Sequence, residues 1–144
     1  NKSKIILEPG RSIIGNTGVL ISKVIYNKEG YKKNFIILDA AMNDLIRPAL
    51  YNAKHQIKPI IKNNRYANKV YEFVGPICES TDKFGSYKKF QKLRENDLII
   101  ICDVGAYGVS LGSNYNLRPK PAEILIEKSK VSVISKRQKL IEII

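Results

Sequence analysis

The sequence predicts a mostly β domain, built as a sandwich or a barrel, and three observations support this fold class. The apolar segments are short and rich in Ile and Val, which favour strands over helices. Turn residues separate these segments at intervals of roughly 8–12 residues, a spacing typical of β-sandwiches and barrels. With 144 residues, 44% of them hydrophobic, the chain is about one globular domain long and can bury a core.

The first half of the chain contains four expected strands. Residues 19–26 form the first strand, which the turn Asn27-Lys28-Glu29-Gly30 is expected to close. A short apolar run over residues 35–38 predicts a buried strand. Apolar and polar residues alternate partly over residues 56–61 and more cleanly over residues 70–74, so both segments favour strands.

The second half adds a central strand and a hairpin. The run Leu98-Ile99-Ile100-Ile101 is too short for a helix and rich in β-branched residues, which favours a central strand. Residues 122–126 and 131–134 are expected to form a closing hairpin across Lys128-Ser129-Lys130. No internal repeat or low-complexity linker divides the strands, so we expect one β-rich unit.

Helices are expected to be few and short. Asn43 and Asp44 can cap a helix over residues 45–51, which Pro48 limits to a turn or two. Residues 138–144 are expected to form a terminal helix. Helical segments of this size can present a few side chains but cannot form a layer of their own.

Charge is the most unusual feature of the composition. Lys and Arg number 25 against 13 Asp and Glu, a net charge of +12 with a sequence pI near 9.7. A non-catalytic basic β-domain that binds nucleic acid is therefore an open alternative. Two features count against it, because the basic residues stand singly or in pairs and the aromatic residues form no stacking platform on any one strand.

The sequence does not predict a membrane or secreted protein. No apolar run approaches ~18 residues, which excludes a transmembrane helix. The first residues, 1–8, are too short and too quickly charged for a signal peptide. They also lack an initiator Met, which predicts a fragment or a processed product. We expect a cytoplasmic protein without nucleic-acid or membrane partners.

Two cysteines and one histidine limit the chemistry available to the chain. Cys78 and Cys102 make no disulfide framework and fit no zinc spacing, so a reducing compartment is expected. Cys102 adjoins an apolar strand and is expected to be a small buried apolar residue. His55 alone cannot supply a multi-histidine metal site, so we expect no metal and place His55 on a strand surface.

Several polar segments between the strands are too distinctive to be plain connectors. Loops on a rigid β scaffold commonly carry functional residues, so the site is expected among them. The segments are E-P-G-R at residues 8–11, D-A-A-M-N-D-L-I-R-P-A-L-Y at 39–51, G-P-I-C-E-S at 75–80, G-A-Y-G at 105–108 and N-Y-N-L-R-P at 114–119.

In this order and spacing, the segments resemble the C-terminal part of the diaminopimelate decarboxylases, pyridoxal-phosphate (PLP) enzymes of the alanine-racemase-like fold type, group IV. The resemblance implies that residues 1–11 end the PLP-binding barrel. It implies that residues 12–144 form the C-terminal β-domain, which carries substrate, cofactor and dimer-interface loops. The (β/α)8 barrel that supplies the Schiff-base lysine has no match here, so the chain alone is expected to be inactive.

The resemblance assigns four residues to PLP. Glu8 matches the carboxylate that bonds the pyridine nitrogen, and a protonated ring is the electron sink that decarboxylation needs. Gly10 matches a glycine that lets backbone amides approach the phosphate. Arg11 offers a planar fork to the substrate and the phosphate, and Tyr107 matches a tyrosine that reaches the phosphate close to the substrate. Surface side chains and a turn glycine remain the plain alternatives.

Four further residues are assigned to the substrate and the chemistry. Arg47 and Tyr51 match residues that hold the distal carboxylate of the substrate, and their i, i+4 spacing puts both on one helix face. Cys78 matches the proton donor, a role open to a thiol because thiols are mostly protonated at neutral pH. Glu79 matches the residue that binds the distal ammonium group.

The implied reaction converts meso-2,6-diaminopimelate to L-lysine and CO2, the last step of lysine biosynthesis, in a homodimer with sites completed across the interface. Glu79 favours this substrate, because relatives that act on ornithine or arginine typically have Asp after the cysteine. A decarboxylase of another basic amino acid remains the alternative. The N-Y-N-L-R-P segment is expected to be structural, without chemistry of its own.

Overall fold

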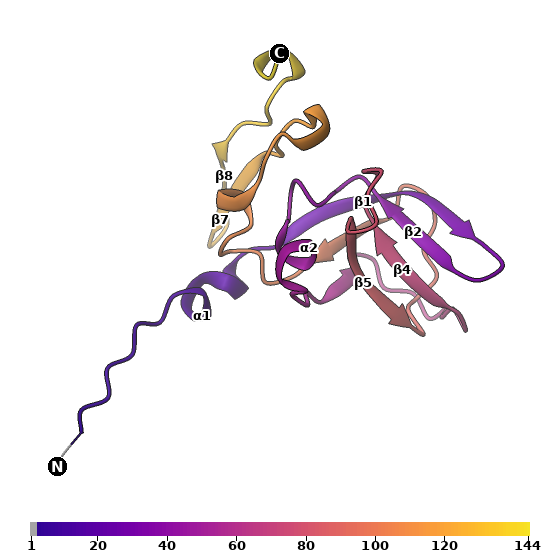
Figure 1. The fold of residues 1–144 in the computed structure, drawn as a ribbon, viewed down its shortest axis with the longest axis horizontal. Helices are drawn as coiled ribbons and strands as arrows, with labels where there is room; N and C mark the ends of the chain where they lie inside the picture. Colours follow the sequence, from indigo (N-terminus) through magenta and orange to yellow (C-terminus); the bar gives the residue numbers. More distant parts are fainter. Residues whose placement is uncertain (1–2) are drawn as a thin grey trace.

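The long strand β1 (Leu20–Glu29) lies in the middle of a six-stranded sheet in the computed structural model, which describes residues 3–144 (Figure 1). Neighbouring strands are antiparallel except for β2 and β4, which run parallel. The order across the sheet is β3 (Ile57–Pro59), β6 (Leu98–Ile101), β1, β2 (Asn34–Leu38), β4 (Val70–Val74) and β5 (Lys83–Lys88). The expected mostly β fold is confirmed.

The sheet curls so that one side chain bridges its two edge strands, β3 and β5. The backbone N–H of Ile57 in β3 donates to the hydroxyl oxygen of Tyr87 in β5 at 2.9 Å, and this hydroxyl donates to the carbonyl of His55 at 2.9 Å. The Tyr87 side chain thus links the two edges of the sheet, which has the shape of a half-barrel. The curled sheet encloses Val24, Ile36, Leu38, Leu45, Ile57, Phe73, Phe84, Ile99 and Ile101, all buried.

Two strands differ from the expectation. β1 continues through residues 27–29, where a turn was expected, because these residues pair with β2 as far as Glu29 opposite Asn34. The turn lies at Gly30–Lys33 and is closed by the Gly30 N–H, which donates to the Lys33 carbonyl at 3.0 Å. β5 was not predicted, since its sequence K-F-G-S-Y-K is polar and contains a glycine; pairing with β4 forms it.

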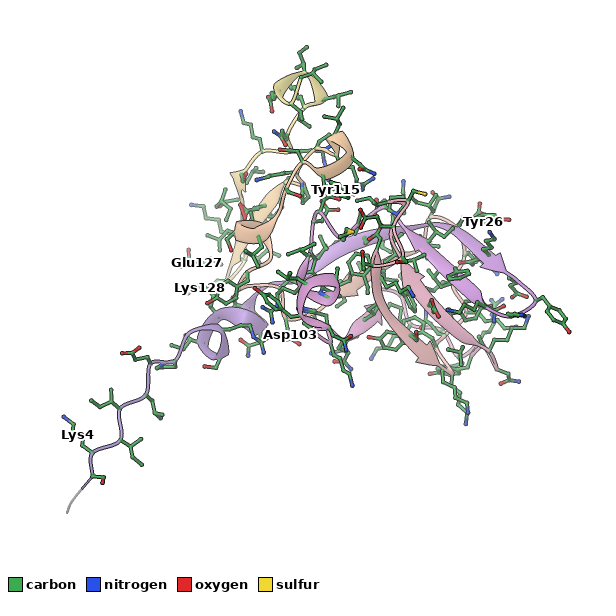
Figure 2. The ribbon with its side chains drawn as sticks, viewed as in Figure 1. Lys4, Tyr26, Asp103, Tyr115, Glu127 and Lys128 are labelled. Carbon is green, nitrogen blue, oxygen red and sulfur yellow. The ribbon has the colours of Figure 1, made fainter. Side chains whose placement is uncertain are left out.

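A hairpin of β7 (Glu123–Glu127) and β8 (Lys130–Ser135) forms a separate two-stranded sheet, as expected for the closing hairpin. It stands apart from the main sheet (Figure 1). The extended segment before α1 (Arg11–Ile14) also projects away, with Lys4 far from the sheet (Figure 2). Both carry large exposed apolar side chains: Ile5, Ile6, Leu7, Ile124, Leu125, Ile126, Val131, Val133 and Ile134.

Helical structure is confined to single turns. The expected helix over residues 45–51 begins at Arg47 as α2 (Arg47–Tyr51), and no side chain caps it. Asp44, expected as a cap, instead accepts the Ala41 N–H at 2.9 Å. The other turns are α1 (Arg11–Ile14), η1 (Gly15–Thr17), η2 (Val109–Leu111), η3 (Tyr115–Leu117) and η4 (Leu140–Glu142), the last replacing the expected terminal helix. Within residues 3–144, none of the helices has the length and apolar character needed to span a membrane.

Candidate functional site

Arg47 and two tyrosines form the first cluster of the candidate site. The Arg47 guanidinium carbon lies 5.6 Å from the Tyr51 ring centre and 5.8 Å from that of Tyr107, distances that permit cation–π attraction. The shared face expected for Arg47 and Tyr51 is confirmed. Within residues 3–144, Arg47 pairs with no carboxylate, and its Nε is buried without a hydrogen-bond partner. The cluster therefore presents an unneutralised cation beside two aromatic rings.

The loop that carries Tyr107 is held against the segment after α1 by close backbone contact. The N–H groups of Val104 and Gly105 donate to the carbonyls of Gly18 and Gly15, at 3.0 and 2.9 Å. A Cβ on Gly105 would lie 2.9 Å from the Gly18 nitrogen, so the contact requires glycine. Tyr107 has a φ of +59°, an uncommon conformation for a tyrosine, which the packed loop maintains.

The residues assigned to PLP at the N-terminal side are exposed, and within residues 3–144 their side chains make no hydrogen bond or ion pair. Glu8 and Gly10 lie in the exposed extended segment, and Arg11 is the exposed first residue of α1. A Cβ on Gly10 would meet nothing within 4 Å. Their sequence order places them just before the segment that docks on the Tyr107 loop, but within residues 3–144 no side-chain hydrogen bond or ion pair connects them to it.

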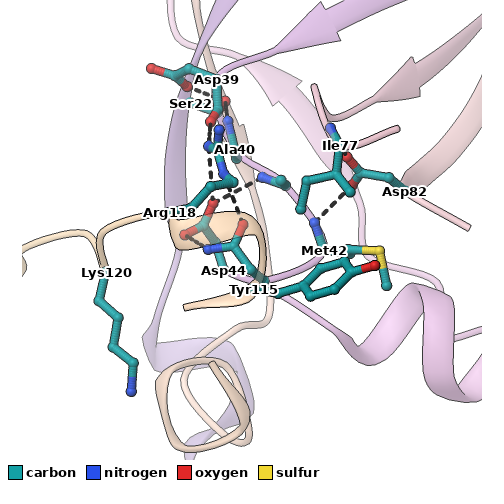
Figure 3. Close-up of polar contacts among 12 residues, drawn as sticks. Ser22, Asp39, Ala40, Met42, Asp44, Ile77, Asp82, Tyr115, Arg118 and Lys120 are labelled. Carbon is teal, nitrogen blue, oxygen red and sulfur yellow. Dashed lines mark hydrogen bonds and ion pairs between the residues drawn. The ribbon is translucent and has the colours of Figure 1, made fainter. Parts of the chain in front are cut away.

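A buried carboxylate organises the loop that carries Cys78 and Glu79. Asp82 is 2% exposed and accepts the Met42 N–H at 2.7 Å and the Ile77 N–H at 2.8 Å (Figure 3). Burial is the main cause that raises the pKa of Asp82, opposed by these two hydrogen bonds. Asp82 thereby ties the Cys78 loop to the segment before α2, and sequence reasoning missed this residue.

Glu79 is held by hydroxyl groups at the exposed tip of the same loop. The Tyr115 hydroxyl of η3 donates to Glu79 Oε1, and the Thr81 hydroxyl donates to Oε2 at 3.1 Å. The hydrogen bond from Tyr115 to the Glu79 carboxylate is the main cause that raises the pKa of Tyr115. Cys78 is exposed and free beside this carboxylate, and Cys102, expected to be buried, is half-buried and also free.

Arg118 anchors the segment that carries Tyr115. Its Nε donates to Asn43 Oδ1 at 2.9 Å, its Nη2 donates to the Asp39 carbonyl, and its guanidinium lies 3.9 Å from Asp44 Oδ2 (Figure 3). Asn43 is buried and donates to the Ser113 carbonyl at 3.3 Å. Two predicted motifs, residues 39–51 and 114–119, are thus joined by a hydrogen-bond network.

The prediction that His55 lies on a strand surface is wrong. His55 is 3% exposed, and its Nδ1 lies 2.9 Å from the Cys102 carbonyl. Because a carbonyl only accepts, Nδ1 carries the hydrogen in this contact. The segment before β3 runs inward to meet Tyr87, so the histidine is enclosed between the two edges of the half-barrel.

The structure therefore separates the predicted residues into two groups. Arg47, Tyr51 and Tyr107 lie together, whereas Cys78 and Glu79 lie on another loop that is fixed by Asp82 and Tyr115. Within the described part of the chain, no hydrogen bond or ion pair joins the two groups. The contact between Tyr115 and Glu79 was missed because the two residues are 36 positions apart in the sequence. The only sequence signal for it was that the motif at residues 114–119 contains both a tyrosine and an arginine.

The fold and these loops define the class of protein. Residues 12–105 match the family described as pyridoxal-dependent decarboxylase, C-terminal sheet domain, and the chain belongs to this family. The matched residues extend from the second residue of α1 to the loop after β6. They include the Arg47 helix and the Cys78 loop.

Individual relatives are more specific. The chain is 46% identical to the diaminopimelate decarboxylase of Aquifex aeolicus over 137 residues, 95% of this chain and 32% of that protein. The crystal structure of diaminopimelate decarboxylase from Helicobacter pylori complexed with L-lysine has a TM-score of 0.84 at 45% identity, covering 94% of this chain and 33% of that chain. The M. jannaschii enzyme has a TM-score of 0.87 at 38% identity, covering 94% and 31%. The chain spans about a third of the length of these relatives.

Proposed function

We propose that this chain is the C-terminal part of a diaminopimelate decarboxylase, which converts meso-2,6-diaminopimelate to L-lysine and CO2. The unneutralised Arg47 guanidinium between two tyrosine rings carries the proposal, because it suits a substrate carboxylate. The exposed carboxylate of Glu79 suits an ammonium group. The 38–46% identity to diaminopimelate decarboxylases supports the same substrate.

The residues assigned to PLP fit the cofactor by their chemistry. Glu8 supplies an acceptor for a ring nitrogen, while Arg11 and the Tyr107 hydroxyl supply donors for a phosphate. All three side chains are exposed and make no ion pair within residues 3–144, so they are free to bind it. Gly10 leaves its backbone open, since a Cβ there would meet no atom within 4 Å.

The proposed chemistry divides between the cofactor and the chain. PLP, when bound, draws electrons from the carbon that loses CO2. Glu8 keeps a proton at the ring nitrogen, and Arg47 with Tyr51 orients the substrate through its distal carboxylate. Cys78 holds a proton at Sγ and delivers it to the carbon from which CO2 has left, and solvent then returns a proton to the sulfur.

The proposed active protein is a homodimer in the cytoplasm. Cys78 and Glu79 lie on a loop that shares no hydrogen bond or ion pair with the Arg47 cluster in residues 3–144, which suits a site completed by the opposite subunit. The exposed apolar side chains of the N-terminal segment and the β7–β8 hairpin suit contact with the rest of a longer chain. The chain by itself is expected to be inactive.

The test uses the full-length protein and replaces Cys78 by Ala, with Cys102→Ala as the matched control. Both cysteines are free, but only Cys78 is on the site loop. We expect Cys78→Ala to lose most lysine formation while PLP absorbance is retained, and the control to retain turnover. Full activity of Cys78→Ala would refute the proton-donor role.

Substrate choice needs a separate measurement. Turnover of meso-diaminopimelate should exceed that of ornithine, arginine and lysine by the same full-length protein. Preference for one of the latter would replace the proposal by the alternative, a decarboxylase of another basic amino acid. Tight DNA or RNA binding that falls steeply with salt, without decarboxylation, would favour the basic binding module.

A further inference from the structure

Both oxygens of the Glu79 carboxylate receive a hydrogen bond, from two hydroxyl groups on different segments. Tyr115 in η3 donates to Oε1, and Thr81 in the Cys78 loop donates to Oε2 at 3.1 Å. A carboxylate held at both oxygens has one orientation, whereas a free glutamate side chain has many. Each oxygen keeps a second lone pair, so the held carboxylate can still accept from an ammonium group.

The segment that carries Tyr115 is held in place by hydrogen bonds on both sides of the tyrosine. Arg118, three residues later, donates to Asn43 Oδ1 at 2.9 Å and to the Asp39 carbonyl. The Ser113 N–H, two residues earlier, donates to the Asn43 carbonyl at 3.0 Å. Tyr115 is therefore fixed on both sides to the buried Asn43.

The loop that carries Glu79 is bound, through Asp82, to Met42, the residue before Asn43. Asp82 accepts the N–H of Met42, adjacent to Asn43, and the N–H of Ile77 in the Cys78 loop. The Asp82 N–H donates to the Glu79 carbonyl at 3.2 Å. The segments that carry Tyr115 and Glu79 are thus both held by the adjacent residues Met42 and Asn43. Figure 3 shows the bond from the Met42 N–H to Asp82.

We infer that Tyr115 is a positioning residue that fixes Glu79 in the orientation that receives the distal ammonium group of the substrate. The inference rests on the proposed function and adds a role to a motif expected to be only structural. Tyr115 acts through Glu79 and does not itself touch the substrate. A preorganised carboxylate binds an ammonium group more tightly because less side-chain freedom is lost on binding.

The experiment compares Tyr115→Phe with the wild type in the full-length enzyme. Removing the hydroxyl frees Glu79, so we expect KM for meso-diaminopimelate to rise about threefold to tenfold, with kcat within about twofold. Tyr31→Phe is the matched control, because Tyr31 is fully exposed and has no place in the site. It should leave both parameters unchanged.

Two ligands separate positioning from general loosening of the fold. In L-lysine, the distal ammonium group of the substrate is the α-ammonium group, because CO2 leaves from the other end of diaminopimelate. 6-Aminohexanoate is lysine without this α-ammonium group. Tyr115→Phe should weaken inhibition by L-lysine by the same factor as KM and leave inhibition by 6-aminohexanoate unchanged. In a Glu79→Gln background, Tyr115→Phe should have little further effect, because the two residues act as one unit.

Several results would overturn the inference. These are a Tyr115→Phe variant equal to Tyr31→Phe, equal weakening of both inhibitors, or effects that add fully to those of Glu79→Gln. Each of them leaves a wild type that decarboxylates diaminopimelate, so the proposed function survives. A wild type without that activity refutes the proposed function itself, and this inference with it.

Discussion

Replacing Asp82 by Asn tests whether one buried carboxylate shapes the Cys78 loop. The side chain is 2% exposed, and its two oxygens accept the N–H groups of Met42 and Ile77 at 2.7 and 2.8 Å. Asparagine has the same shape but only one acceptor oxygen. Its NH2 group must therefore face one of the two backbone N–H groups, which loses a hydrogen bond and leaves a buried donor unpaired.

The magnitude follows from two opposing effects. Losing a charge-assisted hydrogen bond and leaving a buried N–H unpaired costs about 2–4 kcal/mol. Burial raises the pKa of Asp82, which means that the ionised group is costly to bury, and the neutral amide recovers part of that cost. We expect a net local destabilisation of about 2 kcal/mol, equivalent to a roughly 30-fold change in an opening equilibrium.

The assay is amide hydrogen exchange on the full-length protein at the Ile77 and Met42 amides, combined with turnover. Exchange of both amides should accelerate by about 30-fold while β1 and β6 stay protected. Asp97→Asn is the control, since within residues 3–144 the Asp97 side chain accepts a single hydrogen bond, from the exposed Arg94 N–H. If Asp82→Asn changed these amides no more than Asp97→Asn does, the carboxylate would not hold the loop.

Four further single substitutions in the same full-length protein have predicted outcomes. Gly75→Ala should lower the melting temperature, because a Cβ there would lie 2.5 Å from Asp82 Oδ1; Gly10→Ala should leave it unchanged but weaken PLP binding in a cofactor titration. Gly105→Ala should also destabilise, by separating the Tyr107 loop from Gly18, and the loss of exchange protection at Gly105 would show it. Burial is the main cause that raises the pKa of Asp44 above its ordinary value of 3.8. The folded chain therefore binds this proton more tightly than the unfolded chain. As a result, the contribution of Asp44 to stability falls as pH rises from 3.8 through the raised pKa. The stability deficit of Asp44→Asn should therefore shrink as pH rises above 3.8, and a constant difference in melting temperature would contradict this.

The sequence predicts strands well where residues alternate or form a short β-branched run. Residues 70–74 and 98–101 form strands with the expected bounds, because each presents apolar side chains to the core. It fails where pairing with another strand outweighs the local pattern. β5 has the polar sequence K-F-G-S-Y-K and is a strand because β4 supplies its partners. The end of β1 was missed for the same reason.

The candidate site shows the same division. The motifs were enough to place a cation, two tyrosines, a thiol and a carboxylate in the segments between strands. The i, i+4 spacing of Arg47 and Tyr51 was enough to put these two residues on one helix face. What each side chain contacts across the fold was not predictable. His55 was expected on the surface, yet the closing of the half-barrel buries it.

The sequence by itself determined the fold class, the family resemblance and the chemistry of the candidate residues, because these depend on residue type and spacing along the chain. Only the tertiary structure decided that Tyr115 holds Glu79 and that Arg118 holds Asn43, contacts between residues 36 and 75 positions apart. It also decided that the buried Asp82 holds the Cys78 loop against the segment before α2. Such contacts depend on how the sheet curls and where its loops meet, which no local pattern encodes.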